Sequence, residues 1–534
     1  DRRERRAVSS VHPASVPEPA SGQDRLRRAL ANDRVRLAAG LAALGALALL
    51  VRVWALGVGD LVQAEHQKLI AVASWRTGDL FVDGEHPALF KAIVLGSTSV
   101  LGEGQVGLRL PNAVLGAVVV LLTALIARRL GGPLAGWTAG GLMAFSTLAV
   151  SIDRVGKEDT LMLALALGAV LCWLSAERHP RLWIAVAALC GAAAAAKYEA
   201  LPLLPALVVL GWVRLGPRPP GGWRWAGAIV GAFLATHLAL NPLIASPEQW
   251  RFISGFVEAL VSDRPPPDGS LIPTQGFLAA GELFDSKPAW YYPLYLTVKA
   301  QMVWVAAIGV GLAVIAVRFR QSDRFLLLWA VGYVALISMV PFGFARYLAP
   351  ALPALAIVGG IGVAKLLAGR RRSVVVATLV VMGAGLAVPL AAALPYPTLF
   401  VNPLGGGSER ALHWTPNDAV GNLGMAEATR IAETMTPAGA TVAVADPTLV
   451  DFLSGGRLTP VTVEDLPPTP EALRARGVRT VIIQPSELSI GNAPLYAWLE
   501  ESAFPSTVIA VRGLVTVRIY RIGPDGRPSG SAGR

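Results

Sequence analysis

The stretch Arg109–Leu130 reads RLPNAVLGAVVVLLTALIARRL, an apolar segment closed by an arginine pair. Its length matches the roughly 20 residues that a helix needs to cross the hydrocarbon core of a bilayer. Arg128 and Arg129 mark its inner end, because lysine and arginine gather in the cytoplasmic loops of membrane proteins. We therefore expect a transmembrane helix here that runs from the outer face to the cytoplasm.

Apolar segments of similar length recur along the chain, at residues 35–56, 133–150, 160–176, 182–197, 198–213, 223–244, 291–316, 325–343, 349–368 and 373–394. The segment 87–102 is apolar but interrupted, so we expect it to lie on the membrane surface or to re-enter. The sequence thus predicts about eleven spans, with twelve or thirteen as the alternative. An odd number places the arginine-rich loops on one side, as the positive-inside rule requires.

The composition supports a multi-pass membrane protein. Hydrophobic residues make up 54% of the 534 residues and charged residues only 16%, against about 25% charged in soluble domains. The net charge of +11 comes from arginines in short loops, so we expect no nucleic-acid partner. Cys172 and Cys190 both lie inside apolar segments, which argues against a disulfide framework and a cysteine-based metal site.

The sequence divides into three regions. Residues 1–34 are polar and arginine-rich, and we expect a disordered cytoplasmic tail. Residues 35–397 hold the predicted spans, with outer loops at 57–102 and 246–290. Residues 398–534 combine turn residues with short strand-like runs, which predicts a small soluble α/β domain outside the cytoplasm. We expect this domain to have a structural or substrate-gating role.

Ionisable side chains gather at the outer ends of the predicted spans, where their cost indicates function. They are Glu65, His66, Asp83, Glu85 and His86 in the first outer loop (57–102); Arg154, Lys157, Glu158 and Asp159 in a short loop after the segment 133–150, called the second outer loop below; and Lys197, Tyr198, Arg346 and Tyr347 after later spans. A carboxylate can deprotonate an acceptor hydroxyl or amine, and arginine or lysine can neutralise a phosphate leaving group. The alternative is that these residues are ordinary solvated charges at the membrane interface.

The order of several short motifs resembles the GT-C-fold glycosyltransferases that use a polyprenyl-phosphate sugar, among them the protein O-mannosyltransferases and the ArnT-like lipid A aminoarabinose transferases. The similar elements are Glu65-His66, Glu85-His86-Pro87, Arg109-Leu-Pro, Ala127-Arg-Arg-Leu130, Arg154 to Asp159, Lys197, Trp290-Tyr-Tyr-Pro293, Lys299 and Arg346-Tyr-Leu-Ala-Pro350. They span roughly residues 35–400. The resemblance implies a GT-C-like polytopic α-helical fold.

The resemblance also implies an activity. It predicts a hexosyl- or pentosyltransferase that moves a sugar from a polyprenyl-phosphate donor to a lipid, glycan or protein acceptor. The reaction would take place among membrane lipids at the outer face of a bacterial plasma membrane. Glu65 would be the general base, with Asp159 orienting it or sharing its role. Phosphate and substrate would be bound by the other candidates, above all Arg154, Lys197 and Arg346.

Two other functions stay open from the sequence. A transporter or flippase would place charges deep within the spans and would show an internal repeat, and neither is evident. A non-catalytic protein of envelope assembly is motivated by Glu65, because the related enzymes have aspartate there. No metal ligands are assigned, but a divalent cation near Glu85 and His86 is also left open.

Overall fold

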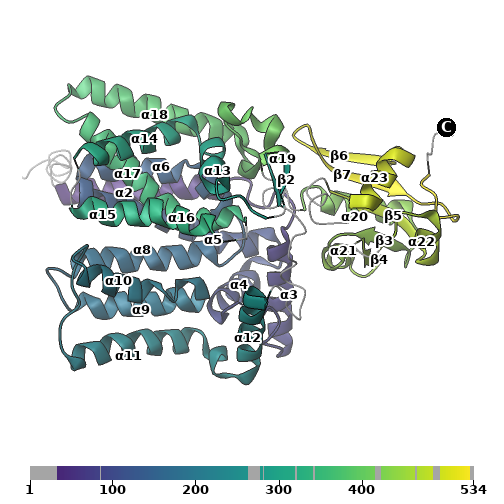
Figure 1. Ribbon diagram of the computed structural model, residues 1–534, viewed down its shortest axis with the longest axis horizontal. Coiled ribbons are helices and arrows are strands. Elements are labelled where there is room, and N and C mark those ends of the chain that lie inside the picture. Colours follow the sequence, from purple (N-terminus) through teal and green to yellow (C-terminus); the bar gives the residue numbers. More distant parts are fainter. Residues whose placement is uncertain are drawn as a thin grey trace, which may run out of the picture.

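In the computed structural model, the chain forms a helical bundle joined to a small α/β domain (Figure 1). The structure describes residues 33–84, 86–262, 277–280, 282–284, 286–318, 321–340, 343–414, 422–463, 466–484 and 493–529. Nearly all of the predicted cytoplasmic tail, and part of the predicted outer loop 246–290, lie outside these residues. The predicted polytopic helical fold with a C-terminal α/β domain is confirmed, whereas the predicted domain boundaries stay predictions.

The bundle consists of helices that run side by side (Figure 1). The longer ones are α2 (Asp33–Val53), α5 (Gln105–Gly131), α8 (Asp159–Ser175), α9 (Leu182–Ala196), α11 (Trp223–Leu240), α14 (Met302–Val317), α17 (Ala351–Leu366) and α18 (Arg372–Ala393). The shorter ones are α6 (Pro133–Ala144), α7 (Thr147–Asp153), α10 (Leu203–Trp212), α13 (Tyr291–Lys299), α15 (Gln321–Leu327), η3 (Leu328–Gly332) and α16 (Tyr333–Ser338).

Among the described residues, α2, α5 and α18 are long and apolar enough to cross a membrane, and α6 with α7, bent by 60°, would make a fourth span. The other apolar helices of the bundle are shorter. Close packing without large side chains holds them together: a Cβ atom on Gly362 of α17 would lie 2.4 Å from the Cα of Gly311 in α14. Small residues permit such close approach between membrane helices. The number of spans stays a prediction.

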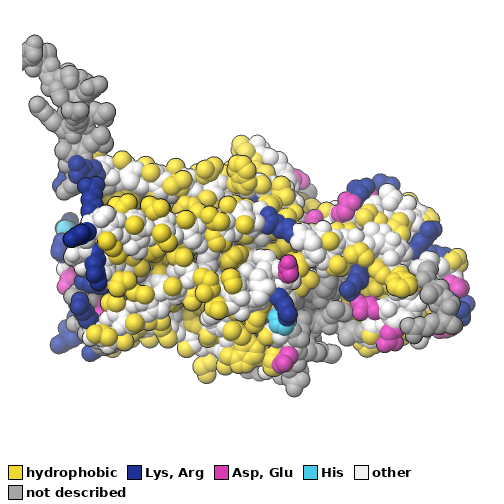
Figure 2. All heavy atoms as spheres, turned by 90° about the horizontal axis from the view of Figure 1, so that it is seen from above, with side chains coloured by type: hydrophobic (Ala, Val, Ile, Leu, Met, Phe, Trp, Pro, Cys, Tyr) yellow, Lys and Arg dark blue, Asp and Glu magenta, His cyan; other side chains and the backbone are white. Residues whose placement is uncertain are grey.

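Charge is distributed unevenly over the bundle. Figure 2 shows a largely hydrophobic lateral surface, with lysine and arginine side chains collected at the end farthest from the C-terminal domain. This asymmetry is what the positive-inside rule describes for a membrane protein. The orientation of the two termini stays a prediction.

Three helices gather at the opposite end, next to the C-terminal domain (Figure 1): α3 (Gln63–Thr77), α4 (Ala88–Leu101) and α12 (Pro247–Ser262). α3 ends at Gly78, whose positive φ of 97° is typical of a helix C-cap. The start of α4 is attached to the end of α11, because the Ala88 amide donates to the side-chain oxygen of Asn241 at 3.0 Å. α4 is the interrupted segment that the sequence placed at the membrane surface.

The C-terminal domain contains a five-stranded sheet in the order β4-β3-β5-β7-β6. β3 (Thr441–Val444) pairs in parallel with β4 (Thr459–Thr462) and β5 (Val478–Ile483), and β7 (Leu514–Arg521) pairs antiparallel with β5 and β6 (Thr507–Val511). Its helices are α20 (Met425–Met435), α21 (Pro447–Ser454), α22 (Pro470–Ala475) and α23 (Ala493–Ser502).

The remaining short elements connect the larger ones. They are the hairpin β1 (Phe277–Ala279) and β2 (Glu282–Phe284), α19 (Ala411–Trp414), and the 3-10 turns η1 (Tyr198–Ala200), η2 (Pro242–Ala245), η4 (Ala345–Leu348), η5 (Pro397–Leu399), η6 (Pro403–Gly405) and η7 (Ser408–Arg410). η1 and η4 carry residues of the candidate site.

Candidate functional site

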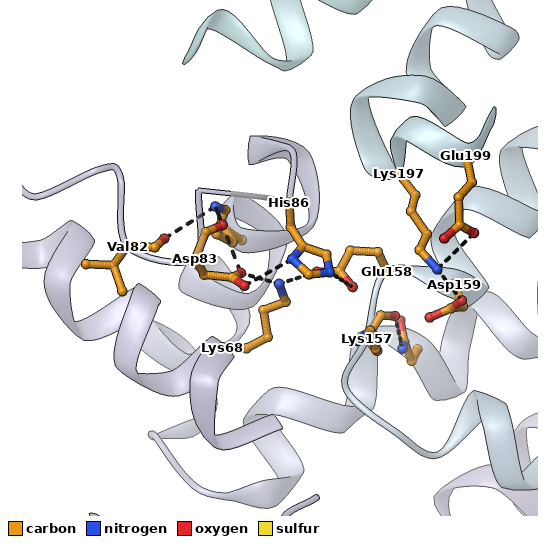
Figure 3. A network of polar contacts seen from close by, with 11 residues as sticks. Lys68, Val82, Asp83, His86, Lys157, Glu158, Asp159, Lys197 and Glu199 are labelled. Atoms are coloured by element: carbon orange, nitrogen blue, oxygen red, sulfur yellow. Dashed lines mark hydrogen bonds and ion pairs between the residues drawn. The ribbon is translucent and has the colours of Figure 1, made fainter. Parts of the chain in front are cut away.

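Charged side chains from separate segments converge at the end of the bundle that holds α3 and α4 (Figure 3). They are Lys68 from α3, Asp83 and His86 from the α3–α4 loop, Lys157 and Glu158 from the α7–α8 loop, Asp159 from the first turn of α8, and Lys197 and Glu199 from the segment after α9. The sequence predicted that the first and second outer loops would meet, and they do.

The second outer loop, residues 154–158, rests on α5. The side-chain amide of Asn112 donates to the carbonyl of Lys157 at 2.6 Å and also to the carbonyl of Val155. Gly156 has no space for a side chain, because a Cβ atom would lie 2.5 Å from Leu108. These contacts fix the direction in which the following charged residues leave the loop.

A buried ion pair holds the helix that precedes this loop. Arg52 of α2 donates through Nε to Asp153 Oδ2 at 2.8 Å, at the end of α7. The hydroxyl of Thr160 donates to the other oxygen of Asp153 at 3.1 Å. Both charged side chains are almost fully buried, so the pair fixes α7 and the start of α8 against the first helix of the bundle.

The first and second outer loops are joined through Lys68. Its amine forms ion pairs with both Asp83 and Glu158. His86 completes the group, with Nδ1 3.1 Å from Asp83 Oδ1 and Nε2 4.0 Å from Glu158 Oε2. The side chains of Lys68, Asp83 and Glu158 are at most 5% exposed.

This group keeps its charges despite its burial. Burial opposes the charge of Lys68, but Asp83 and Glu158 outweigh that effect and raise its pKa. Burial likewise opposes the charge of Glu158, yet His86 and Lys68 hold the pKa of its carboxyl well below the usual range. Burial favours neutral His86, but Glu158 and Asp83 raise its pKa. Lys68 and Glu158 are therefore charged at neutral pH, and the two carboxylates favour the protonated form of His86.

A second group forms around Asp159. Its Oδ1 accepts a hydrogen bond from the Lys197 amine at 2.8 Å, and that amine also lies 3.0 Å from Glu199 Oε2. The amine of Lys197 lies 5.5 Å from the centre of the Tyr347 ring. Asp159 Oδ2 is buried and has no hydrogen-bond partner in the part of the chain that the structure describes. One oxygen of this carboxylate is thus held by Lys197, and the other, although buried, accepts no hydrogen bond from a described residue.

Lys157 lies between the two groups and is half-buried. Burial lowers the pKa of its amine to about 8, and the positive charge of Arg346 adds to this effect, while the two neighbouring carboxylates offset only part of it. The Lys157 amine makes no hydrogen bond or ion pair with another described residue. A cation placed near other cations with no anion of its own is suited to bind an anionic ligand.

Glu65 has different surroundings from those expected of a general base. Arg109 donates through Nε to Glu65 Oε1 and through Nη2 to Oε2, both at 2.8 Å. The amide of Gly156 donates to Oε1 at 2.8 Å, and that of Val62 donates to Oε2 at 3.1 Å. Each oxygen therefore accepts two hydrogen bonds from buried donors. The predicted base role stays a prediction, and the contacts favour a role in holding the second outer loop.

Arg154 also makes contacts other than those predicted for a phosphate ligand. Its guanidinium donates to the carbonyls of Arg52 at 2.9 Å, Trp54 at 2.6 Å, Ala55 at 3.0 Å and Pro395 at 3.4 Å. These carbonyls lie in the last turn of α2 or just beyond the C-terminal ends of α2 and α18, where helix carbonyls lack partners. The contacts of Arg154 thus stabilise backbone, and its phosphate-binding role stays a prediction.

His66 and Tyr198 lie at the edges of the site. His66 Nε2 lies 3.4 Å from the Thr448 hydroxyl of α21, so this residue contacts the C-terminal domain. The hydroxyl of Tyr198 accepts hydrogen bonds from the side-chain amides of Asn241 and Gln249, both at 3.2 Å. Tyr198 therefore connects η1 to α11 and α12. Glu85 lies outside the described residues.

Arg346 and Tyr347, predicted as binding residues, are placed near Asp159 by η4. The Arg346 guanidinium lies 3.9 Å from the centre of the Phe344 ring and 5.6 Å from that of Tyr347. Aromatic faces attract and orient a guanidinium. Its charge lies close enough to lower the pKa of Lys157. The structure thus brings together residues that are far apart in the sequence.

Sequence reasoning missed three cations. Lys68 is absent from the predicted site residues, although it shares α3 with Glu65. Lys91 donates to the carbonyl of Asp83 at 2.7 Å, and Arg109 pairs with Glu65. A signal for Lys91 and Arg109 was available, because a charged residue inside an apolar segment requires a buried partner.

Only one group of possible metal ligands occurs among the described residues. Asp83, His86 and Glu158 each offer a ligand atom, and these atoms all lie within 4.8 Å of one another. The position near His86, where the sequence left a divalent cation open, therefore has suitable donor atoms. The amine of Lys68 nevertheless lies against two of the three residues.

The chain is similar to known glycosyltransferases. Residues 85–239 match the model of the family described as dolichyl-phosphate-mannose-protein mannosyltransferase. The undecaprenyl phosphate-alpha-4-amino-4-deoxy-L-arabinose arabinosyl transferase 1 of Pseudomonas fluorescens is 27% identical over 287 residues, which cover 51% of this chain and 49% of the relative. The chain thus matches about half the length of that relative.

Solved structures show the same fold over most of the chain. ArnT from Cupriavidus metallidurans in the apo state matches with a TM-score of 0.51 and 16% identity, over 90% of this chain and 98% of that chain. The same protein bound to undecaprenyl phosphate matches with a TM-score of 0.50 and 15% identity, over 90% and 97%. The resemblance predicted from the sequence motifs is therefore confirmed, and the chain has the GT-C fold of ArnT.

Proposed function

We propose that this chain is an integral membrane glycosyltransferase that uses a polyprenyl-phosphate sugar as its donor. The fold supports this proposal, because ArnT from Cupriavidus metallidurans has the same fold and binds undecaprenyl phosphate. The apolar lateral surface of the bundle supports it as well, because a polyprenyl chain dissolves in the bilayer beside such a surface (Figure 2).

The observation that carries the proposal is the position of Lys157. Its amine has no ion-pair partner among the described residues, and it lies near the charges of Arg346 and Lys197. A phosphate group placed there would relieve the repulsion between the three cations. The charge that develops on the phosphate as the sugar leaves would be stabilised by the same cations.

Asp159 is the base that the geometry favours. Lys197 orients the carboxylate by holding Oδ1, and Oδ2 is left to accept a proton from the hydroxyl or amine of the acceptor. The acceptor oxygen or nitrogen forms a bond to the anomeric carbon while the bond from that carbon to the phosphate oxygen breaks. The polyprenyl phosphate leaves with the electron pair, and the proton moves to Asp159.

Glu65 supports this chemistry without contacting the reacting atoms. The hydrogen bonds that it accepts from Arg109 and Gly156 hold the second outer loop, which carries Lys157 and leads directly into Asp159 at the start of α8. We therefore assign the base to Asp159, which the sequence had proposed to share this role, rather than to Glu65. The acceptor could be a lipid, a glycan or a protein, and the sugar a hexose or a pentose, at the outer face of a bacterial plasma membrane.

The proposal is tested by incubating the purified protein in nanodiscs with synthetic polyprenyl-phosphate hexose and pentose donors and with lipid, glycan or protein acceptors, and by measuring the release of polyprenyl phosphate. Asp159→Asn should lower turnover at least about 100-fold, as expected for loss of a general base. Lys157→Met should weaken donor use, and Arg474→Ala, on the exposed surface of α22, should have no effect. Full turnover by both Asp159→Asn and Lys157→Met would refute the site assignment.

A further inference from the structure

The Asp83–His86–Glu158 group has the donor atoms of a divalent-cation site. Two carboxylates and one imidazole, with atoms within 4.8 Å of one another, form a set that Mn²⁺ or Zn²⁺ accepts. Asp83 and His86 come from the loop between α3 and α4, and Glu158 comes from the loop between α7 and α8. A cation held there would join the two outer loops.

A lysine of the chain already places a positive charge at this position. The Lys68 amine forms ion pairs with both carboxylates, and all three side chains are buried. A second amine, that of Lys91, lies 4.0 Å from Asp83 Oδ2 and donates to the carbonyl of the same residue. Among the described residues, two ammonium groups thus lie beside Asp83 and Glu158 before any metal is considered.

A divalent ion would meet strong repulsion in this arrangement. It would bring two more positive charges into a buried space where the described residues already place the Lys68 and Lys91 ammonium groups beside the two carboxylates. It would also have to displace the Lys68 amine from the carboxylate oxygens that would be its own ligands. Removing a buried ammonium from both of its partners costs free energy. Displacement of Lys68 is therefore opposed by this cost as well as by the charge repulsion.

We propose that Lys68 takes the place of a divalent cation in this chain. Its ammonium joins the first and second outer loops, and the wild-type protein binds no divalent ion at Asp83, His86 and Glu158. Loss of the Lys68 amine exposes these residues as a metal site. The inference rests on the proposed function only in one respect: Lys68 would be a positioning residue that holds Glu158, and with it Lys157 and Asp159.

The metal-binding part is tested with Mn²⁺ alone, by the loss of the electron paramagnetic resonance signal of the free ion. The full-length protein in nanodiscs is compared as wild type, Lys68→Ala, Lys68→Gln and Lys68→Arg. Wild type and Lys68→Arg should bind no Mn²⁺ at this group. Lys68→Ala and Lys68→Gln should each bind one ion, and Asp83→Asn added to either variant should abolish that binding.

Two results would overturn the inference. One is binding of one Mn²⁺ by the wild type that is lost in Asp83→Asn, and this result needs no Lys68 variant to fold. The other is the absence of Mn²⁺ binding by a Lys68→Ala or Lys68→Gln protein that elutes and unfolds like the wild type. Neither readout depends on sugar transfer, so failure of the proposed function would leave this test intact.

The positioning part is tested by turnover. Transfer by the wild type should be insensitive to a chelator. Lys68→Ala should lose kcat with little change in the KM for donor, and Mn²⁺ should restore part of that kcat, because the ion would rejoin the loops. A chelator-sensitive wild type, or a Lys68→Ala protein with unchanged kcat, would contradict this role.

Discussion

Lys197 Nζ lies 2.8 Å from Asp159 Oδ1 and connects the end of α9 to the first turn of α8. Both side chains are less than a tenth exposed, so neither charge is screened by bulk water. The contact leaves Asp159 Oδ2 without a hydrogen-bond partner among the described residues. A held and charged carboxylate with one available oxygen is the arrangement that a general base requires.

Variants of the Lys197–Asp159 pair should show that stability and turnover depend on it in different ways. Lys197→Met leaves a buried uncompensated carboxylate, which should cost about 3–5 kcal/mol of unfolding free energy. Adding Asp159→Asn should restore part of that stability but none of the activity. Denaturant unfolding and turnover, measured on both proteins, check this. Activity that recovers together with stability would show that the carboxylate is not needed for transfer.

Substitutions of Glu65 and of Asp159 should have opposite effects on stability and on turnover. Glu65→Gln leaves the buried Arg109 guanidinium without its counter-charge, and we expect a loss of about 3–5 kcal/mol in stability. Thermal unfolding measures this loss. Asp159→Asn should instead abolish turnover in a protein that still folds. A Glu65→Gln protein with wild-type stability and no turnover would return the base role to Glu65.

Donor binding should depend on pH through Lys157. Burial and Arg346 lower the pKa of its amine to about 8, so the amine is charged below that pH and loses its charge as the pH rises through it. Affinity for polyprenyl phosphate should therefore fall between about pH 7 and 9, since pH 8 is the midpoint of that titration. Lys157→Arg should move the fall to higher pH, because arginine stays protonated. An unchanged pH profile in Lys157→Arg would exclude Lys157 as the titrating group.

Gly156 should be intolerant of any side chain. A Cβ atom there would lie 2.5 Å from Leu108 Cγ, so Gly156→Ala must displace the buried Leu108 side chain or the loop that carries Lys157 and precedes Asp159. We expect kcat to fall by about 100-fold, since displacements of about 1 Å have effects of that size. Leu108→Ala combined with Gly156→Ala should recover part of the loss. A fully active Gly156→Ala protein would mean that the loop position does not matter for turnover.

Much of the fold was predictable because the bilayer imposes its own length and polarity. The apolar segment 109–130 lies within α5, and the segment 373–394 corresponds to α18. The meeting of the outer loops was predictable from sidedness alone, since the charged loops lie at the same ends of their helices. The strands of the C-terminal domain were predictable from short apolar runs between turn residues.

Which groups each charged side chain of the site contacts was not predictable from the sequence. Glu65 pairs with Arg109 of α5, and Arg154, at the end of α7, binds backbone carbonyls. The packing of α5 and α7 in the bundle determines both sets of contacts. Lys68 escaped notice because a lysine in a polar helix is usually solvated, and its burial is visible only once α3 lies against the second outer loop. Periodicity and spacing carry no information about such contacts.

The proposed site is tested most directly by a cryo-electron microscopy structure of the wild-type protein with undecaprenyl phosphate in nanodiscs. We expect the phosphate to lie within hydrogen-bond distance of the Lys157 amine and the Arg346 guanidinium, with Asp159 Oδ2 facing the space beside it. A phosphate bound elsewhere, with Lys157 and Asp159 facing protein alone, would contradict the proposed site.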